Sequence, residues 1–530
     1  MVRIVCLFLL LMHSVVFGQA PKTAVFNVKD FGATGKKTPS AQLAIQKAID
    51  ACAAAGGGMV YLPPGEYSSG TLILKNHVRL HIESGATLYS IKDKTAFTKD
   101  ALIFADGAEN ISIEGRGTID GQGRYEWRLN DIEDDFIRPN MDQMTALGKP
   151  LNRSFPKKDQ FGKLVLLLRC KDVRISGLSF IDSPSWTIHP YACERLTIDG
   201  VYIRSSLKDG VWADGIDPDG CKDVRISNCT IETGDDALVF YSMNWFGPAL
   251  PCENITVTNC RLTSSSSAIK FCDGNMNAIR NVTIDNCVIR SSNRGIAFMN
   301  FDGGEVSDVV LSNLTVECVR NDWFWWGDGD PLHFNIKRRS EVHKSIKPED
   351  DKNPAGKIRR VLITNVIAKG YGSSICNGHP ESWLEDITLN NVKLTVAHDT
   401  QAPYDKARSG LVFKQVRNLK LKDVEVTWEK PGYDAWEGAL VLDEVDGLDM
   451  DHFSGIAWKP KYPAILLNQV EHAVIRNLSA APGTETFLQF TGGRTKGILL
   501  QGNDFRSARN PFLYETGLMG SQIRSEGNVK

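Results

Sequence analysis

The chain has 530 residues, a formal net charge of -2 at pH 7, and 42% hydrophobic and 23% charged residues. A nearly neutral balance provides no extended basic surface, which argues against a nucleic-acid-binding protein. The sequence shows no metal-ligand spacing, no phosphate-binding glycine loop and no Ser/His/Asp signature, so no metal and no cofactor are expected.

Residues 1–20 predict a secretory signal peptide. An apolar run at residues 4–16 follows a basic residue, and Gly18-Gln19-Ala20 provides the small-x-small ending that signal peptidase prefers. The run is too short for a membrane span, and no later segment is apolar for long enough. We therefore expect residues 21–530 to form a secreted or periplasmic protein without a membrane span, and we expect it to be a monomer.

Residues 38–58 predict a short helix near the start of the mature chain. Thr38-Pro39 could provide the cap and the first helical residue, apolar residues follow at helical spacing, and three glycines at residues 56–58 would end the helix. Such a helix could cover the open end of a sheet, whose strand edges would otherwise pair with other molecules.

A short strand motif recurs through most of the chain. Its pattern is apolar-x-apolar-x-(Asn/Gly/Asp)-apolar, and this alternation is typical of a pleated strand. Its intervals run from 23 to 32 residues with one longer gap, which favours a solenoid of stacked coils over a propeller with blades of roughly 40 residues. The motif begins at Val173, Leu196, Val224, Ile255, Val282, Val309, Val361, Ile387, Leu419, Leu448 and Ala473.

The 12 cysteines could suggest disulfides in an exported protein. However, Cys229, Cys260 and Cys287 occupy the same place in successive repeats. We therefore expect them to be stacked, apolar side chains inside the coils rather than disulfide partners.

Two segments interrupt the repeats, at about residues 121–163 and 317–357. Long loops in compact repeats are usually functional or disordered. The second contains Trp325 and Trp326, together with Trp323, and flat aromatic faces suit sugar rings. We predict that Trp325 and Trp326 bind substrate, with anchoring of the loop as the alternative.

Carboxylates are concentrated around a predicted strand between residues 212 and 240. Asp214 and Asp235 are 21 residues apart (235 − 214), close to one repeat, so they should lie on neighbouring coils roughly 4.8 Å apart. Together with Asp236 they should raise the pKa of one carboxyl group. An acid with a raised pKa beside ionised carboxylates is what glycoside hydrolysis uses. Taken singly, Asp-Gly and Gly-Asp pairs are equally typical of turns.

The stretch DGIDPDG, followed by a strand and TGDDAL, resembles the active-site core of glycoside hydrolase family 28, the polygalacturonase family of the pectate-lyase-like β-helix superfamily. The resemblance implies an all-β fold, a right-handed single-stranded parallel β-helix, with the short N-terminal helix as its cap. It implies Asp235 as general acid, Asp214 and Asp236 as the bases that activate water, and inversion at the anomeric carbon. Asp217, within the first motif, is predicted to bind substrate.

Two motifs of the family are absent. Residues 266–267 are serines where the family has a histidine, and residues 297–299 read Ala-Phe-Met where the family has Arg-Ile-Lys. In the family, that Arg and Lys are associated with gripping a uronate carboxylate, so homogalacturonan is not the expected best substrate. Lys270 is predicted to bind substrate in their place, with a solvated outward side chain as the alternative.

The sequence therefore predicts a secreted glycoside hydrolase acting on a pectin-type or related acidic polysaccharide, without a cofactor. One alternative is a β-helix lyase or epimerase, which would abstract the C5 proton of a uronate with an Arg or Lys base. Another is a non-catalytic glycan-binding β-helix whose aspartates are structural. A lyase leaves a product that absorbs ultraviolet light, a hydrolase leaves only new reducing ends, and a binding protein leaves the glycan intact.

Overall fold

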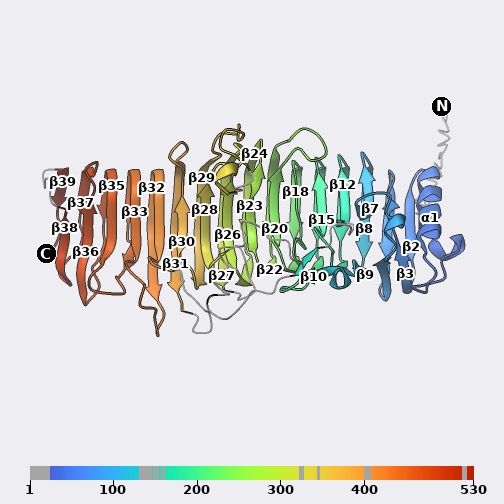
Figure 1. The fold of residues 1–530 in the computed structure, drawn as a ribbon, viewed down its shortest axis with the longest axis horizontal. Coiled ribbons are helices and arrows are strands. Elements are labelled where there is room, and N and C mark those ends of the chain that lie inside the picture. The colour runs from blue at the N-terminus through green and yellow to red at the C-terminus, as the bar shows by residue number, and fades with distance from the viewer. Residues whose placement is uncertain are drawn as a thin grey trace, which may run out of the picture.

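The computed structural model describes residues 24–129, 146, 154–156, 162–320, 327–342, 346–398, 407–515 and 522–530. Over these residues the chain winds into one long solenoid, with its N-terminal coils at one end and its C-terminal coils at the other (Figure 1). Strands of successive coils pair in parallel along its length. The predicted right-handed parallel β-helix is confirmed.

The repeat read from the sequence sets the register of the coils. β18 (Lys222–Ser227), β21 (Cys252–Thr258) and β24 (Ala278–Asp285) pair in order, so that Val224 lies opposite Ile255 and Ile255 opposite Val282. The same alignment joins every predicted repeat start from Val173 to Ala473. These side chains stack into one continuous core, which a single coil could not bury alone.

Asparagines hold a corner between strands of successive coils. Asn228, Asn259 and Asn286 have φ values of 58°, 55° and 53°, in the left-handed region that Asn tolerates better than most residues. The Asn259 amide donates to Asn228 Oδ1 (3.3 Å), and the Asn286 amide donates to Asn259 Oδ1 (2.6 Å). Each corner is therefore fixed to the one before it.

Helix α1 (Gln42–Ala54) lies at the N-terminal end of the solenoid, as predicted (Figure 1). Its buried face, which includes Ile45 and Ile49, joins the core. The helix begins later than predicted from Thr38-Pro39: its N-cap is Ala41, and Gln42 N donates to the Ser40 hydroxyl just before it (3.3 Å). No helix among the described residues is long and apolar enough to cross a membrane.

Every cysteine in the described part of the chain is a buried free thiol. Cys229, Cys260 and Cys287 follow Asn228, Asn259 and Asn286 on consecutive coils and belong to the core. The prediction of stacked apolar cysteines is confirmed.

The two interruptions differ from the predicted insertions in detail. In the first, β10 (Trp127–Leu129) and β11 (Ser154–Pro156) form a separate antiparallel pair. The second is not one continuous insertion, because β28 (Asp330–Ile336) pairs with β26 (Arg294–Asn300) and buries Leu332 and Phe334 in the core. Residues 1–20, Trp325 and Trp326 lie outside the described residues.

One face of the solenoid positions the candidate site. Its strands run parallel across consecutive coils, and residues 216–219 bridge the two strands at its centre. These strands are β7 (Ala101–Asp106), β12 (Lys163–Leu168), β15 (Ile188–Tyr191), β20 (Leu238–Ser242), β23 (Ser267–Asn275), β26 and β28. We call this the site face.

Candidate active site

A cavity of about 440 Å³ opens on the site face. It lies around the coil in which Ile216 forms parallel bridges to Ile188 of β15 and Leu238 of β20. Its volume falls within the roughly 300–1,000 Å³ range of small-ligand pockets. We call it the central cavity.

Asp214, Asp235 and Asp236 line this cavity together. Gly215 N donates to the Asp236 carbonyl (2.9 Å), so the segment at Asp214 pairs directly with the turn at Asp236. One carboxylate oxygen of each aspartate lies within 4.8 Å of the others, which confirms the spacing predicted from neighbouring coils. All three side chains are buried, so their negative charges interact strongly.

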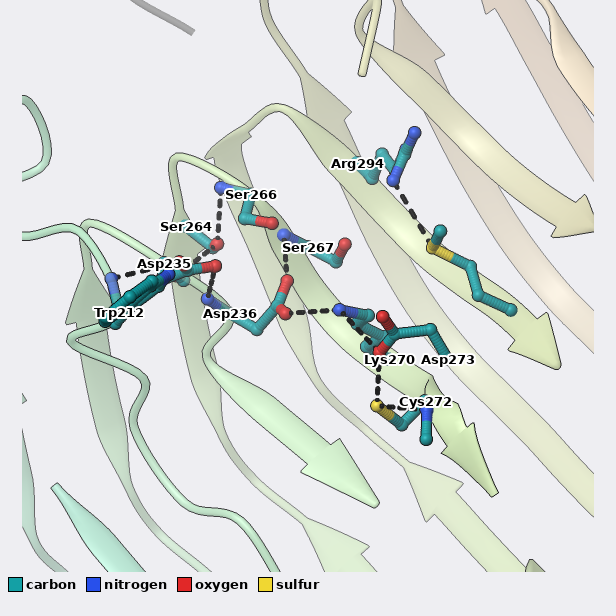
Figure 2. A network of polar contacts seen from close by, with 12 residues as sticks. Trp212, Asp235, Asp236, Ser264, Ser266, Ser267, Lys270, Cys272, Asp273 and Arg294 are labelled. Atoms are coloured by element: carbon teal, nitrogen blue, oxygen red, sulfur yellow. Dashed lines mark hydrogen bonds and ion pairs between the residues drawn. The ribbon is translucent and has the colours of Figure 1, made fainter. Parts of the chain in front are cut away.

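Backbone groups orient Asp235. Its Oδ2 accepts from Trp212 N (3.1 Å) and its Oδ1 accepts from Asp236 N (3.0 Å), while Ser264 Oγ donates to its carbonyl (2.6 Å) (Figure 2). Trp212 has a φ of 60°, an uncommon value for a bulky residue. This left-handed backbone presents the N–H of Trp212 to the Asp235 carboxylate.

Lys270 is the partner of Asp236. Its Nζ lies 2.9 Å from Asp236 Oδ2 and 3.5 Å from Asp273 Oδ1, while Ser267 N donates to Asp236 Oδ1 (2.8 Å) (Figure 2). Burial lowers the pKa of Lys270, but Asp236 and Asp273 outweigh burial and hold the pKa well above its usual value. The alternative of a solvated outward side chain is wrong, because the Lys270 side chain is only 13% exposed on the site face.

Asp214 has a strongly perturbed carboxyl group. Burial raises its pKa well above the usual value, and the charges of Asp235, Asp217 and Asp236 add to the effect. Its Oδ1 has no hydrogen-bond partner among the described residues. The predicted rise in pKa within the cluster is therefore found at Asp214.

Asp217 does not line the central cavity. It is fully buried, because it lies between His189 and Val239 of the neighbouring strands, which are also fully buried. Burial, followed by the charges of Asp236 and Asp235, raises its pKa well above the usual value. The predicted contact between Asp217 and substrate is therefore not available in this structure.

Aromatic side chains that the sequence reading did not single out form one wall of the cavity. Trp186 stacks on Tyr241 and packs against Trp245, with ring centroids 5.0 Å apart in both pairs. Trp245 is 44% exposed, and Trp212, beside the carboxylates, is 52% exposed. Spacing alone could not identify them, because Trp186 and Trp245 lie on separate coils and meet only through the register.

The structure also shows apolar side chains at residues 297–299, where the family has an Arg and a Lys. Ala297 and Met299 pack with Phe301 in a buried apolar cluster on the site face. Arg294 and Arg339 lie nearby. Arg294 Nε is 3.6 Å from Asp330 Oδ2, and Arg339 pairs with Asp302 and reaches Asp273 (3.5 Å). Neither arginine lines the central cavity.

The three carboxylates are also the group of described residues whose oxygens are close enough to hold a metal ion. Carboxylate oxygens suit Ca²⁺ or Mg²⁺, which usually take six or more oxygen ligands. Lys270 already neutralises Asp236 at 2.9 Å. The cluster therefore offers a cation less negative charge than three unpaired aspartates would.

Comparisons with known proteins agree with this geometry. A probable polygalacturonase of Vitis vinifera is 27% identical over 267 residues, covering 45% of this chain and 49% of that protein. Mannuronan C5-epimerase AlgE1 of Azotobacter vinelandii is 54% identical over 197 residues, covering 36% of this chain and 12% of that protein. The chain thus spans about half, or less, of the length of these relatives.

A solved exopolygalacturonase from Thermotoga maritima has a TM-score of 0.59 at 21% identity, covering 78% of this chain and 94% of that one. This likeness shows the shared fold. The model of the family described as glycosyl hydrolases family 28 matches residues 52–323, which is 272 of 530 residues (323 − 52 + 1) and includes all three clustered aspartates. The chain belongs to glycosyl hydrolases family 28.

Proposed function

We propose that this protein is a secreted glycoside hydrolase that cleaves a glycosidic bond in a pectin-type or related acidic polysaccharide. The observation that carries the proposal is the cluster of Asp214, Asp235 and Asp236, whose oxygens lie within 4.8 Å of one another in an open cavity. Relatives named polygalacturonases support a pectic substrate. The signal-like residues 1–20 support secretion.

The surroundings of each carboxylate support a division of labour. Lys270 donates to Asp236, and a cationic partner suits a carboxylate that acts as a base on water. Asp214 shares the water-activating role as the second base, as the family resemblance implies. Asp235, directed into the cavity by two backbone N–H groups, delivers a proton to the leaving oxygen as general acid.

The raised pKa of Asp214 and the acid role of Asp235 are compatible within one cluster. Carboxyl groups this close exchange protons and titrate as a unit. A proton shared within the cluster is then available to Asp235 for the leaving oxygen, which leaves Asp214 to act on water. The proposal therefore predicts that Asp214→Asn and Asp235→Asn both lower kcat, and that they change different limbs of its pH profile.

Inversion at the anomeric carbon follows from the family resemblance. Most inverting enzymes separate their two carboxyl groups by roughly 6.5–9.5 Å to leave room for water. The oxygens here approach within 4.8 Å, so we propose that water binds beside the whole cluster rather than between two opposed groups. Nuclear magnetic resonance of the first-formed anomer decides this point directly: the inverted anomer is expected, and the retained anomer would contradict it.

The match to a C5-epimerase favours a second candidate, proton abstraction at C5 of a uronate. That chemistry needs an unprotonated base near the sugar. The raised pKa of Lys270 keeps it charged, and burial together with neighbouring acidic groups raises the pKa of Tyr241 well above its usual value. Hydrolysis by the carboxylates therefore accounts for the cavity better.

A reducing-end screen of the mature protein on pectic and algal glycans tests the proposal. New reducing ends without ultraviolet-absorbing product are expected from the wild type, together with a loss of about 100-fold to 10,000-fold in Asp235→Asn. An ultraviolet-absorbing product would establish a lyase. Wild-type turnover in all three Asp→Asn variants would refute the assignment of the cluster.

A further inference from the structure

We propose that the central cavity binds an uncharged sugar residue, with its ring against tryptophan, and that it discriminates against a free uronate. This inference rests on the proposed function and names the substrate class of the same site. In a pectin-type polymer, such a residue is either a neutral sugar between uronates or a uronate whose carboxyl group is esterified.

The charge lining the cavity is the first reason. Four carboxylates line it, Asp214, Asp235, Asp236 and Asp273, against the two cations Lys163 and Lys270. Lys270 pairs with Asp236 and Asp273, and Lys163 Nζ lies 3.2 Å from Asp100. Among the described residues that line the cavity, each cation is already engaged by carboxylate. Arg339 also reaches Asp273 (3.5 Å), but a sugar carboxylate would still enter beside Asp214 and Asp235, which is unfavourable in a desolvated site.

The apolar cluster beside Lys270 is the second reason. Lys270 lies opposite Ala297, which is fully buried and packs with Met299 and Phe301. This buried cluster adds no cation of its own beside Lys270, and the arginines that lie against Met299 and Phe301, Arg294 and Arg339, are engaged by aspartates. A hydroxymethyl, methyl or ester group has no charge to leave unpaired there.

The tryptophans are the third reason. Trp212 and Trp245 are both about half exposed and both line the cavity, although large aromatic side chains usually bury most of their surface. Trp186 packs against Tyr241 and Trp245, so the wall is formed without a ligand. Aromatic faces bind the C–H faces of sugar rings without requiring charge.

The test compares three oligosaccharides as substrates of the wild-type protein. The first is an oligogalacturonide, the second is the same oligomer with methyl-esterified carboxyl groups, and the third alternates galacturonate with a neutral deoxyhexose. The first two share sugar and linkage and differ in charge alone. We expect kcat/KM for the better uncharged substrate to exceed that of the free acid by about 100-fold, the effect of a like-charge contact of a few kcal/mol.

The esterified and the alternating oligomers distinguish the source of the uncharged residue. Preference for the ester identifies a modified uronate, and preference for the alternating oligomer identifies a neutral sugar. Equal or better cleavage of the free acid would overturn the inference while leaving hydrolysis intact. If none of the three were cleaved, the proposed function would fail, and quenching of tryptophan fluorescence by the three oligomers would still decide the charge preference.

Two sets of variants make the test specific. The double variant Ala297→Arg/Met299→Lys supplies cations and is expected to improve binding of the free acid relative to its ester. Trp245→Ala is expected to raise KM for the uncharged substrate, with recovery in Trp245→Phe. Tyr125→Ala removes an exposed aromatic side chain outside the central cavity and serves as the matched control. An unchanged KM in folded Trp245→Ala would contradict ring stacking on Trp245.

Discussion

Replacement of Lys270 by methionine distinguishes two roles for this residue, positioning of a catalytic carboxylate and direct binding of substrate. Lys270 Nζ lies 2.9 Å from Asp236, and the two side chains are 13% and 2% exposed. Removing one partner of a buried ion pair costs about 3–5 kcal/mol, much of it from the charge left behind. In Lys270→Met, Asp236 would face Asp214 and Asp235 without this cation and would take up a proton.

The expected kinetic result follows from that proton. A protonated Asp236 cannot accept a proton from water, so kcat should fall by about 100-fold to 10,000-fold, with activity regained only as the pH rises. If Lys270 instead gripped a substrate carboxylate, KM for anionic oligomers should rise while the pH profile stays in place. Steady-state kinetics across pH on anionic and esterified oligomers separate these outcomes.

Two control variants complete this experiment. Lys270→Arg keeps a positive charge and should retain most of the pH profile. Lys393→Met breaks a surface pair with Glu425, whose side chains are 60% and 42% exposed, and should change stability by about 0–1 kcal/mol without affecting kcat. Near wild-type kcat and an unchanged pH profile in folded Lys270→Met would refute the role of Lys270 in holding Asp236.

Three further predictions concern stability and the tryptophan loop. Burial raises the pKa of Asp219 from 3.8 to about 7, so its stabilising contribution is complete below about pH 3.8 and is lost as the pH rises through about 7. The free energy of unfolding of Asp219→Asn, measured in urea, should therefore rise by about 4 kcal/mol relative to that of the wild type between about pH 4 and pH 8. A difference between the two proteins that does not change with pH would contradict this. Asn259→Ala should lower the free energy of unfolding by about 1–3 kcal/mol, because the substitution removes the hydrogen bond to Asn228 and because alanine tolerates a positive φ poorly. Asn259→Gly should lower it less, because glycine tolerates that φ. Trp325→Ala and Trp326→Ala should raise KM in folded protein if the loop binds sugar, and unchanged kinetics would leave these residues as loop anchors.

The periodic part of the fold was predictable because each coil repeats the same local chemistry. The motif at Val224 and its equivalents alternates apolar and polar side chains, and the parallel register aligns these positions as the spacing indicated. Asp214, Asp235 and Asp236 converge for the same reason, because one repeat of sequence separates two neighbouring coils. Local periodicity was therefore sufficient to predict both the solenoid and the carboxylate cluster.

Features that depend on the third dimension were harder to predict. Lys270 was predicted to bind substrate, with an exposed side chain as the alternative, but the register places its ammonium beside Asp236. Asp217 shares a motif with Asp214, yet the neighbouring strands cover it completely. The wall of Trp186 and Trp245 combines residues from different coils, so no sequence window contains it.

Hydrolysis in water labelled with oxygen-18 tests the central claim most directly. The account predicts that the wild-type protein incorporates one labelled oxygen into each new reducing end of a pectic oligosaccharide, because the carboxylate cluster activates water for attack at the anomeric carbon. Mass spectrometry of the products should find this label with the wild type and its loss with Asp235→Asn, checked by circular dichroism for an intact fold. Cleavage without label, or equal labelling by the wild type and the Asp214→Asn, Asp235→Asn and Asp236→Asn variants, would contradict the account.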